Sequence, residues 1–470
     1  MQGERREGEF LQACLAAGKR ILEFDDAVVV HHFDADGLSA GAVIFSAMLR
    51  NGIAPAMVCW KKTTLENVMA LKERKEKQVV IADLAYNPLL VEHLKDKEVI
   101  VLDHHEVDPT PLPENFTLVN SHSFGIDGGI EVSGGGTSYL AFRNYRELSQ
   151  LALVSAVGDM QDKDGSLIGI NQIILVDAVK EGVATVKKDL KMFGKGSRSL
   201  IGFLSYCTDP YLPGLTGNDK NCAIFLRDSG IDYKQGDKYV SYFDLSENDR
   251  KKFASALIEY CAEKGLGEEV TTQMIGDTII FNKEPRGPFY EAHEFATLMN
   301  ACGRNNASEI GVKACLGNVE ARQAAINLYE EHRRNLRSGI TLARNKISDV
   351  GEFYLLDCRG QVKDAIIGIV AGALAGSADI VHGKPVIALS IDEDDAEMVK
   401  MSARATNQLV RSGIDLNAML RTATAGLGKS IGGGHKVAAG ASVEKKHLPE
   451  FLKRCAEIIK EQNTKAKSSG

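Results

Sequence analysis

The chain has 470 residues, of which 44% are hydrophobic and 25% are charged, with 45 glycines, 11 prolines and a formal net charge of −7 at pH 7. This length exceeds what one ordinary hydrophobic core organises, so we expect two or three domains, and the composition excludes a disordered or fibrous protein. The negative charge excludes a chain coated in basic surface, but it leaves room for a local basic track.

The amino-terminal segment and the cysteines predict where the chain works. The first residues, MQGERREGEFLQACLAAGKR, are charged and lack the apolar core of a secretory signal, and no apolar run reaches the roughly 20 residues of a membrane span. The nine cysteines are scattered without a CxxC pair, which favours reduced thiols over a disulfide framework or a zinc ribbon. We therefore expect a cytoplasmic protein with no membrane partner.

Three short apolar runs in the first third predict buried strands, at Ala27–Val30, Val79–Ala82 and Glu98–Leu102. Helix-like segments separate them, and this βαβ rhythm predicts a parallel sheet with helices on both faces. Each run leads into a segment that contains aspartate: HHFDADG, ADL and DHH. The carboxyl ends of strands are where open α/β sheets bind ligands, so the position of these segments is informative.

The rest of the chain predicts a helical middle and a second α/β domain. Residues 149–304 are mostly helical in pattern, with a basic stretch at 187–198 and a turn-rich segment at 209–219. A long amphipathic helix at 319–347 is expected to tie two lobes together. Beyond it, EFYLLDC, PVIALSID and AEMVKMSARA predict strands around an Ala/Gly-rich helix at 365–375, followed by a final helix.

The HHFDADG segment places three polar side chains two residues apart. An extended backbone would project His32, Asp34 and Asp36 to the same side, and Gly37 would then permit a sharp turn into a helix that begins near Ser39. A solvated Asp-Gly loop is the alternative interpretation of this segment taken alone.

Further aspartates close the other strands. Asp83 ends the second run, Asp103, His104 and His105 end the third, and Asp159 follows a small-residue helix that starts near residue 149. Four carboxylates cannot share a partly desolvated crevice without cations. Oxygen and imidazole ligands without thiolate favour Mn²⁺ or Mg²⁺, and two such ions roughly 3.5–4 Å apart suit in-line displacement at phosphorus. The alternative is that these residues are unrelated core histidines and surface aspartates. That alternative must account for aspartate at the ends of three strands at once.

These segments resemble the four motifs of the DHH phosphoesterase superfamily, with HFDADG as motif I, IADL as motif II, LDHH as motif III and VGDMQD as motif IV. The resemblance implies a set of metal ligands in which Asp83 bridges two ions: His32, Asp34, Asp36, Asp83, His104 and Asp159. It also implies that Asp83 and Asp159 act in catalysis with His105, which would contact the scissile phosphate and stabilise charge or assist the leaving oxygen.

The carboxyl-terminal segment IGGGHKVAAGAS resembles the substrate-binding motif of the DHHA1 domain. Glycines let backbone N–H groups approach a phosphate, while the following His and Lys add polar and cationic contacts. An arginine in MVKMSARATNQ could hold a phosphate through its guanidinium fork. A structural Gly-rich turn and an ordinary exposed Arg are the alternatives. The implied substrate-binding residues are Arg404, Gly432, Gly433, Gly434, His435 and Lys436.

The middle segments KDLKMFGKGSRSLIGFL, DPYLPGLTGN and EAHEFATLMNACGR are similar to archaeal RecJ-like proteins, including GINS-associated nucleases, and the resemblance covers nearly the whole chain. It implies a DHH catalytic domain at 1–165, a mainly helical middle region at 166–318 that completes the catalytic lobe, a linker helix at 319–347, and a smaller DHHA1 substrate-binding domain at 348–465. A group of basic side chains could line the path of a nucleic-acid strand or could form only a solvated face. The group consists of Lys187, Lys188, Lys191, Lys195 and Arg198.

The resemblance implies a Mn²⁺- or Mg²⁺-dependent exonuclease with two ions per active site. It would hydrolyse phosphodiester bonds of single-stranded DNA or RNA from an end and release mononucleotides in replication or repair. The 5′ to 3′ direction is favoured, and GINS or the replicative helicase complex is an expected partner. Two alternatives stay open: an oligoribonuclease or small-nucleotide phosphodiesterase or phosphatase acting on pAp or a cyclic dinucleotide, and a replisome scaffold that binds GINS. The residues leave polarity, DNA or RNA preference, metal identity and oligomeric state open.

Overall fold

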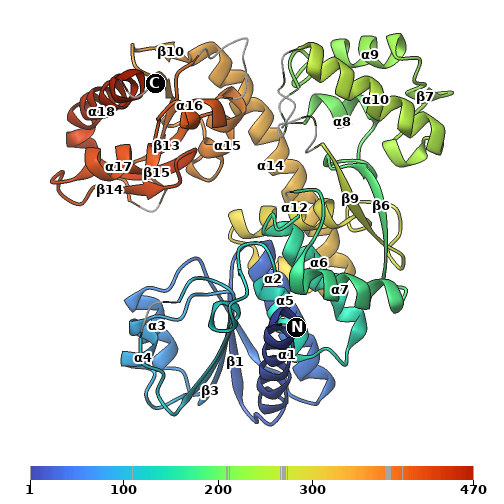
Figure 1. The fold of residues 1–470 in the computed structure, drawn as a ribbon, viewed down its shortest axis with the longest axis vertical. Helices are drawn as coiled ribbons and strands as arrows, with labels where there is room; N and C mark the ends of the chain where they lie inside the picture. The colour runs from blue at the N-terminus through green and yellow to red at the C-terminus, as the bar shows by residue number, and fades with distance from the viewer. Residues whose placement is uncertain are drawn as a thin grey trace. The chain divides into compact units, whose positions relative to one another are not determined.

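A computed structural model describes residues 2–107, 110–162, 164–207, 210, 212–264, 266, 271, 274–375, 383–393 and 395–468. The chain divides into two compact units (Figure 1). Unit 1 comprises Met1–Leu200 and Lys234–Glu330, and unit 2 comprises Ile201–Tyr233 and Glu331–Gly470. Among the described residues, no helix combines the length and apolar character that crossing a membrane requires. The four-part domain division expected from the sequence stays a prediction.

Unit 1 is built on a five-stranded, fully parallel sheet with strand order β2-β1-β3-β4-β5. The apolar runs at β1, β3 and β4 are confirmed as central strands, because both of their faces are buried. The edge strands β2 and β5 were not predicted, since short half-buried strands lack a continuous apolar run. The strands are β1 (Ala27–His32), β2 (Ala56–Trp60), β3 (Gln78–Ala82), β4 (Glu98–Asp103) and β5 (Phe116–Asn120).

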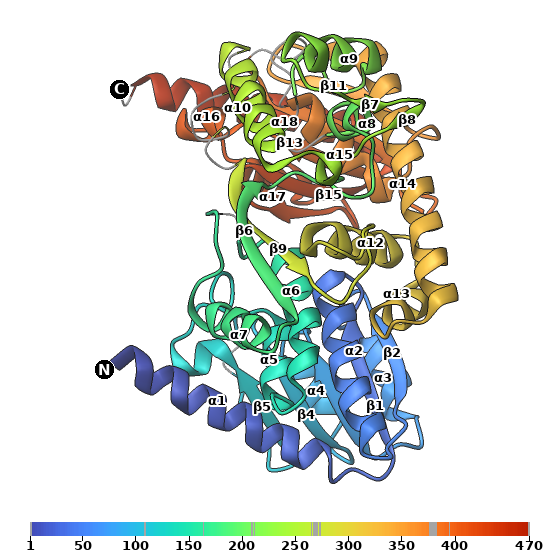
Figure 2. The ribbon, with the colours of Figure 1, turned by 90° about the vertical axis from the view of Figure 1, so that its right-hand side faces the viewer.

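Helices cover both faces of this sheet, as the sequence predicts. On one face, alternate strand residues such as Val29 and Val80 pack with α1, α2, α5 and α6, and α2 and α5 lie in front of the strands in the view of Figure 2. On the other face, Val28 and Val79 pack against α3 and α4. The helices are α1 (Gln2–Ile21), α2 (Ala35–Arg50), α3 (Leu65–Lys72), α4 (Pro88–His93), α5 (Gly134–Ala141) and α6 (Ser149–Gly158).

The remainder of unit 1 adds helices and an antiparallel ribbon in which β6 pairs with β9 from Ala184↔Phe281 to Leu190↔Ile275. The sequence placed this region in a helical pattern, and β6 corrects that prediction. A two-stranded pairing across about ninety residues leaves no local signal when one strand is rich in lysine. The further elements are α7 (Gly169–Lys180), β6 (Ala184–Leu190), β7 (Lys234–Gln235), β8 (Lys238–Tyr239), α10 (Glu247–Glu263), β9 (Ile275–Phe281), α12 (Ala292–Arg304) and α13 (Ser308–Cys315).

Unit 2 contains a six-stranded mixed sheet with strand order β10-β11-β12-β13-β15-β14, in which only β11 and β12 pair in parallel. Helix α15 covers one face, where Ile366 and Val370 pack on Val386 and Ala388. Helices α17 and α18 cover the other. The predicted second α/β domain is confirmed. Its strands are β10 (Ser348–Asp349), β11 (Tyr354–Asp357), β12 (Val386–Ile391), β13 (Met398–Arg404), β14 (Ile431–Gly434) and β15 (Ala438–Glu444).

The predicted long helix is confirmed as α14, Val319–Lys346, which continues from unit 1 into unit 2. Helix α8 likewise spans the division between the units near residue 200. The other helices of unit 2 are α8 (Leu200–Ser205), α9 (Asp219–Asp228), α15 (Asp364–Ala375), α16 (Asn407–Arg411), α17 (Leu416–Thr424) and α18 (Leu448–Ser468).

Candidate metal centre

The HHFDADG segment turns from strand to helix earlier than the sequence predicts. Strand β1 ends at His32, and α2 begins at Ala35 with Asp34 as its N-cap, whose Oδ1 accepts from Gly37 N–H at 3.0 Å. Asp36 therefore lies in the first helical turn rather than on an extended backbone. Gly37 also does not make the turn through a positive φ. It is a glycine because a Cβ there would lie 2.4 Å from His32 Cβ.

Asp83 follows β3 directly and adopts a left-handed backbone conformation, with φ of +57°. Aspartate tolerates this region better than most residues, although it still stores strain. The side chain is 2% exposed, and its carboxylate lies between two imidazoles: His104 Nε2 is 3.1 Å from Oδ1 and His32 Nδ1 is 3.4 Å from Oδ2. Burial would raise the pKa of Asp83, but the two histidines outweigh it and lower that pKa.

His104 is oriented by the backbone. Its Nδ1–H donates to the carbonyl of Gly128 at 2.7 Å, which directs Nε2 toward Asp83 and toward Asp36 Oδ2 at 3.4 Å. Burial would lower the pKa of His104, yet the surrounding carboxylates raise it well above the usual value. The same holds for His32, whose pKa rises to about 10 beside Asp34 and Asp83. These pKa values mean that the carboxylates hold protons on the imidazoles when no other cation is present.

Asp36 is held by the amino terminus of α5. Its carboxylate accepts from Gly134 N–H at 2.9 Å and Gly135 N–H at 2.7 Å, and from the hydroxyl of Ser155. Even with these donors, burial and then the charge of Asp83 raise the pKa of Asp36 to about 8. A carboxylate with so many donors and a raised pKa indicates a crowded negative site that a cation would relieve.

Asp159 is the C-cap of α6, which starts at Ser149 as predicted. Its Oδ2 accepts from Gln161 Nε2 at 2.7 Å and lies 3.9 Å from His104 Nδ1. Burial raises the pKa of Asp159 as well. Gln161 and the groups that donate to Asp36 were not predicted from the sequence. The available signal was the SGGG run at 133–136, where an N-cap serine and glycines open an apolar helix.

The structure therefore brings the six predicted ligands together in unit 1. Their side chains form overlapping groups whose donor atoms lie within 4.8 Å of one another: His32 with Asp34 and Asp83, Asp36 with His104 and Asp159, and Asp83 with His104 and His105. Two buried atoms here, Asp83 Oδ2 and His32 Nδ1, face each other at 3.4 Å as an ion pair, and neither has a well-aligned hydrogen bond to a described residue. Buried polar atoms need partners, and a donor set of carboxylates and imidazoles suits Mn²⁺ or Mg²⁺. The residues fit a metal centre.

His105 stands at the edge of this cluster and is held by a buried carboxylate. Its Nδ1 lies 2.8 Å from Asp103 Oδ1, and its side chain is 45% exposed, whereas Asp103 is fully buried. Asn120 Nδ2 donates to Asp103 Oδ2 at 3.2 Å and to the carbonyl of His105 at 2.9 Å. The hydrogen bond that His105 donates to Asp103 raises the pKa of His105 against the effect of burial. Asp103 is thus a positioning residue that the sequence analysis did not identify.

Replacing Asp103 with asparagine should lower the kcat of a reaction at this centre about 10- to 100-fold, because a group that orients a neighbouring functional side chain has effects of that size. Metal affinity should stay unchanged, since Asp103 is in none of the three groups that could hold an ion. Steady-state kinetics and Mn²⁺-dependent thermal shifts on the same protein separate the two effects. An unchanged kcat, or a kcat loss matched by lost metal affinity, would contradict this role.

Helix α12 contributes two groups from far along the chain. Asn300 Oδ1 accepts from Ala35 N–H at 3.0 Å and so holds the start of α2. Burial lowers the pKa of Arg304, and the negative charge of Asp34 partly opposes this effect. The helix can approach this closely because Gly303 has no side chain, and a Cβ there would lie 1.9 Å from the carbonyl oxygen of Phe33.

The predicted substrate-binding residues lie in unit 2, at one end of its sheet. Arg404 ends β13 and pairs in register with Ala438, and Gly432–Gly434 form the edge strand β14 rather than a turn. The turn follows at His435, whose N–H donates to Ala438 O at 2.8 Å, and Lys436 lies within it. Strand register therefore brings Arg404 and the turn to the same end of the sheet.

Most of the basic side chains in the stretch at 187–198 are buried or half-buried in unit 1. Lys195 is fully buried and donates to Leu190 O and Thr278 Oγ1. Lys191 pairs with Asp162, and Arg198 is 8% exposed. Lys187 and Lys188 remain on the surface of β6, as the burial pattern of that strand shows.

Comparison with known proteins gives two domain matches. A DHH-CID domain model matches residues 192–275, and a DHHA1 domain model matches residues 352–461. An uncharacterized protein of Methanocaldococcus jannaschii is 31% identical over 444 residues, which cover 92% of this chain and 93% of that protein.

Solved structures share the fold at low sequence identity. CDC45 from Entamoeba histolytica matches with a TM-score of 0.62 and 13% identity, over 97% of this chain and 98% of that one. RecJ from Thermus thermophilus in complex with Mn²⁺ matches with a TM-score of 0.57 and 16% identity, over 96% of this chain. The chain spans 55% of the length of that RecJ.

Proposed function

Because the chain belongs to the RecJ-like DHH/DHHA1 superfamily of phosphoesterases, we propose that it is a metal-dependent exonuclease that hydrolyses single-stranded DNA or RNA from an end and releases mononucleotides. The observation that carries the proposal is the cluster around Asp83, where carboxylates and imidazoles form overlapping groups whose donor atoms lie within 4.8 Å of one another. We expect the working direction to be 5′ to 3′.

The residues that would hold a pair of Mn²⁺ or Mg²⁺ ions are His32, Asp34, Asp36, Asp83, His104 and Asp159, and Asp83 would serve both ions. When bound, such ions activate water and neutralise charge on the reacting phosphate. The RecJ structures with bound manganese or magnesium support this metal class. The backbone amides of α5 keep Asp36 oriented toward the cluster.

We assign His105 to the scissile phosphate. The neighbouring Asp103 fixes its ring through Nδ1, so that the exposed part of the imidazole remains available for a phosphate oxygen or the leaving oxygen. In unit 2, we propose that the end of the nucleic-acid substrate is bound by Arg404, Gly432–Gly434, His435 and Lys436. A guanidinium and neighbouring glycines suit phosphate contacts.

The CDC45 likeness, over almost the full length of both chains, favours a second candidate function beside hydrolysis. In this proposal the protein also binds a replication partner such as GINS and acts partly as a scaffold. The convergence of all six candidate ligands weighs against a scaffold without catalysis. Co-purification of the chain with GINS, compared between the wild type and a metal-site variant, tests whether the two roles are separable.

One digestion experiment tests the main proposal and its substrate alternative together. Matched DNA and RNA strands of about thirty nucleotides, long enough for several contact sites, are labelled at either end and compared with a dinucleotide. Each is incubated with Mn²⁺, Mg²⁺ or EDTA. We expect mononucleotide release from one end and no reaction in EDTA. A strong preference for the dinucleotide would favour the small-nucleotide alternative, and activity in EDTA would overturn the metal mechanism.

A further inference from the structure

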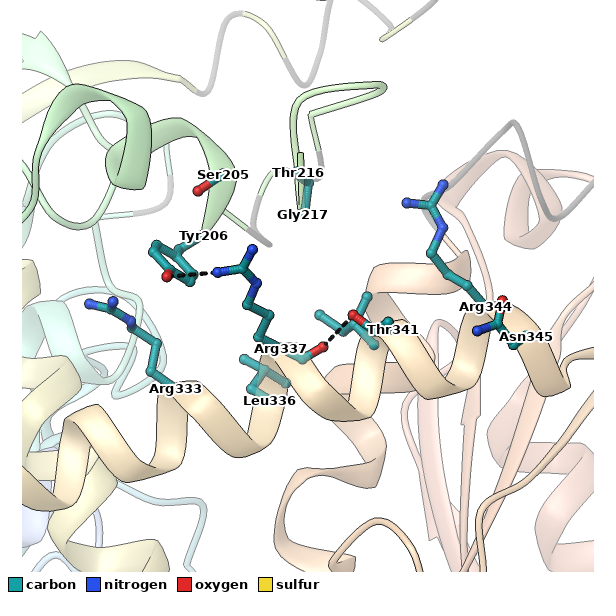
Figure 3. A pocket seen from close by; sticks show the side chains of 11 residues that line it. Ser205, Tyr206, Thr216, Gly217, Arg333, Leu336, Arg337, Thr341, Arg344 and Asn345 are labelled. Carbon is teal, nitrogen blue, oxygen red and sulfur yellow. Dashed lines mark hydrogen bonds between the residues drawn. The ribbon is translucent and has the colours of Figure 1, made fainter. Parts of the chain in front are cut away.

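A pocket lies wholly within unit 2, and none of the residues assigned to the metal centre lines it. Its cavity volume is about 260 Å³, and one wall is a face of α14 that presents Arg333, Arg337 and Arg344 (Figure 3). Residues spaced by four and seven positions lie on the same side of a helix, so the three guanidiniums point the same way. Figure 3 shows all three rising from α14 toward the opposite rim.

The opposite rim is held in place by hydrogen bonds. Gly217 N–H donates to the carbonyl of Ser205 at 2.7 Å, which fastens the turn before α9 to the end of α8. Within that turn, Thr216 Oγ1 donates to the carbonyl of Cys207 and accepts from Leu212 N–H at 2.9 Å. The rim is therefore a built structure that faces the arginines.

One buried polar atom at the rim has no internal partner. Ser205 is 2% exposed and lines the pocket, and its hydroxyl makes no hydrogen bond to any described residue. A buried hydroxyl without a partner costs stability, so such atoms usually mark a missing water, ion or ligand. The Ser205 hydroxyl is itself inaccessible, so the arginines define the chemistry of a ligand in this pocket.

The charge of the lining selects an anion. Three arginines and no carboxylate occur among the described residues that line the pocket. Outside the lining, Asp219 forms an ion pair with Arg337 at 3.7 Å. Guanidinium forks match the oxygens of phosphate groups with paired hydrogen bonds. Arg337 and Arg344 are about 10 Å apart along the helix, from its rise of about 1.5 Å per residue, so the lining can meet more than one anionic group.

The aromatic ring at the rim is already used. The guanidiniums of Arg333 and Arg337 lie over Tyr206 at 4.1 and 5.0 Å from its centroid, and Arg337 Nη1 donates to its hydroxyl at 2.8 Å. Tyr206 therefore orients the arginines rather than stacking on a base. Leu336 and Ile340 supply an apolar floor. A ligand held in this way is recognised through phosphate and sugar, with little dependence on base identity.

We propose that this pocket of unit 2 is a phosphate-binding site for a nucleotide, either a free mononucleotide or one nucleotide of a strand. The proposal goes beyond the catalytic function and does not depend on it, because none of the residues assigned to the metal centre lines the pocket. A volume of about 260 Å³ lies just below the range of about 300–1,000 Å³ for small-molecule sites, which suits one nucleotide unit.

Binding is measured in EDTA on the full chain carrying Asp83→Asn, so that hydrolysis cannot consume the probe. Labelled pentathymidylate is the probe, and dTMP, inorganic phosphate and pentaglutamate are competitors. The variant Arg344→Gln is compared with Arg334→Gln, which removes the same charge from an exposed neighbouring position outside the pocket. We expect Arg344→Gln to weaken binding about tenfold, the size of a lost charge-assisted hydrogen bond, and Arg334→Gln to change it less than about twofold.

The competitors distinguish the two sources of the ligand. Competition by dTMP as strong as that by unlabelled pentathymidylate would identify the free nucleotide, and competition only by the strand would identify a strand site. Either supports the proposal if the Arg344→Gln loss accompanies it. Equal effects of Arg344→Gln and Arg334→Gln would overturn it, as would equally strong competition by pentaglutamate, because a carboxylate-rich peptide would then be the better description of the ligand.

A second pair of variants covers the case in which loss of Arg344 disturbs folding. Thr341 is exposed and lines the pocket, whereas Ser338 is exposed on the same helix and does not. A glutamate at position 341 would repel phosphate, so Thr341→Glu should weaken binding at least about tenfold while Ser338→Glu should not. Unchanged binding in Thr341→Glu, with melting temperatures matching the wild type, would overturn the proposal.

Discussion

Replacing Asp83 with asparagine is expected to slow single-strand hydrolysis by at least about a thousandfold, which corresponds to about 4 kcal/mol of transition-state stabilisation. The side chain lies between His32 and His104 and belongs to two of the three groups that could hold an ion. Asparagine keeps the shape but removes the negative charge that would be shared by two cations. Initial rates with Mn²⁺ in excess measure the effect.

The matched control for Asp83→Asn is Asp96→Asn, which makes the same change at an exposed position after α4. It should leave the rate within about twofold of the wild type, because exposed charges contribute little. Mn²⁺ should raise the melting temperature of the wild type and of Asp96→Asn but not that of Asp83→Asn, because a ligand that binds only the native state stabilises it. Substantial hydrolysis by Asp83→Asn would contradict the assignment of the centre.

A half-buried histidine elsewhere in unit 1 should make stability fall as the pH rises. His293 lies between two carboxylates, with Nε2 2.9 Å from Asp162 Oδ2 and Nδ1 2.9 Å from Glu291 Oε1. Burial alone would lower the pKa of His293, but the charge of Glu291 and the contact with Asp162 raise it to about 9. The charged histidine therefore stabilises the fold below about pH 6.5, its ordinary pKa, and this contribution of about 3 kcal/mol is lost as pH rises through about 9.

The measurement compares free energies of unfolding of the wild type and His293→Gln from denaturant titrations at several pH values. The difference between the two proteins should be largest near pH 6 and shrink toward about pH 10. The control is His93→Gln, a half-buried histidine on α4 whose ring lies 4.0 Å from the carboxylate of Glu92. A His293→Gln curve that runs parallel to the wild type, or that departs from it no more than the His93→Gln curve does, would show that His293 carries no such charge.

The metal centre shows how far local pattern reaches. The apolar runs before Asp83 and Asp103 identified two strands, and parallel pairing of β3 with β4 brings their carboxyl ends together. Asp159 was located through the small-residue helix before it. The backbone conformation of motif I was wrong in detail, because the N-cap interaction of Asp34 starts α2 immediately after the strand. Of the candidate ligands in this segment, Asp34 and Asp36 are placed by the first turn of α2 and not by an extended backbone.

The residues that hold the candidate ligands in place could not be predicted from the sequence. Asp36 is held by Gly134 and Gly135, about a hundred positions away, and Ala35 by Asn300 in α12. Such contacts depend on which helices pack on which face of the sheet, and no local period encodes that. The same reasoning applies to β6, whose lysine-rich sequence becomes a strand only because β9 lies beside it.

The amino-acid sequence by itself determined the parallel sheet, the long helix α14, the second α/β domain and the identity of six acidic and imidazole groups at strand and helix ends. Each of these depends on a short apolar period or on residue types adjacent to it, which local side-chain chemistry encodes. The tertiary structure alone decided the hydrogen-bond partners of Asp36, the burial of Lys195 and the arginine pocket of unit 2. Those features join segments far apart in the chain, and only packing determines which distant side chains become neighbours.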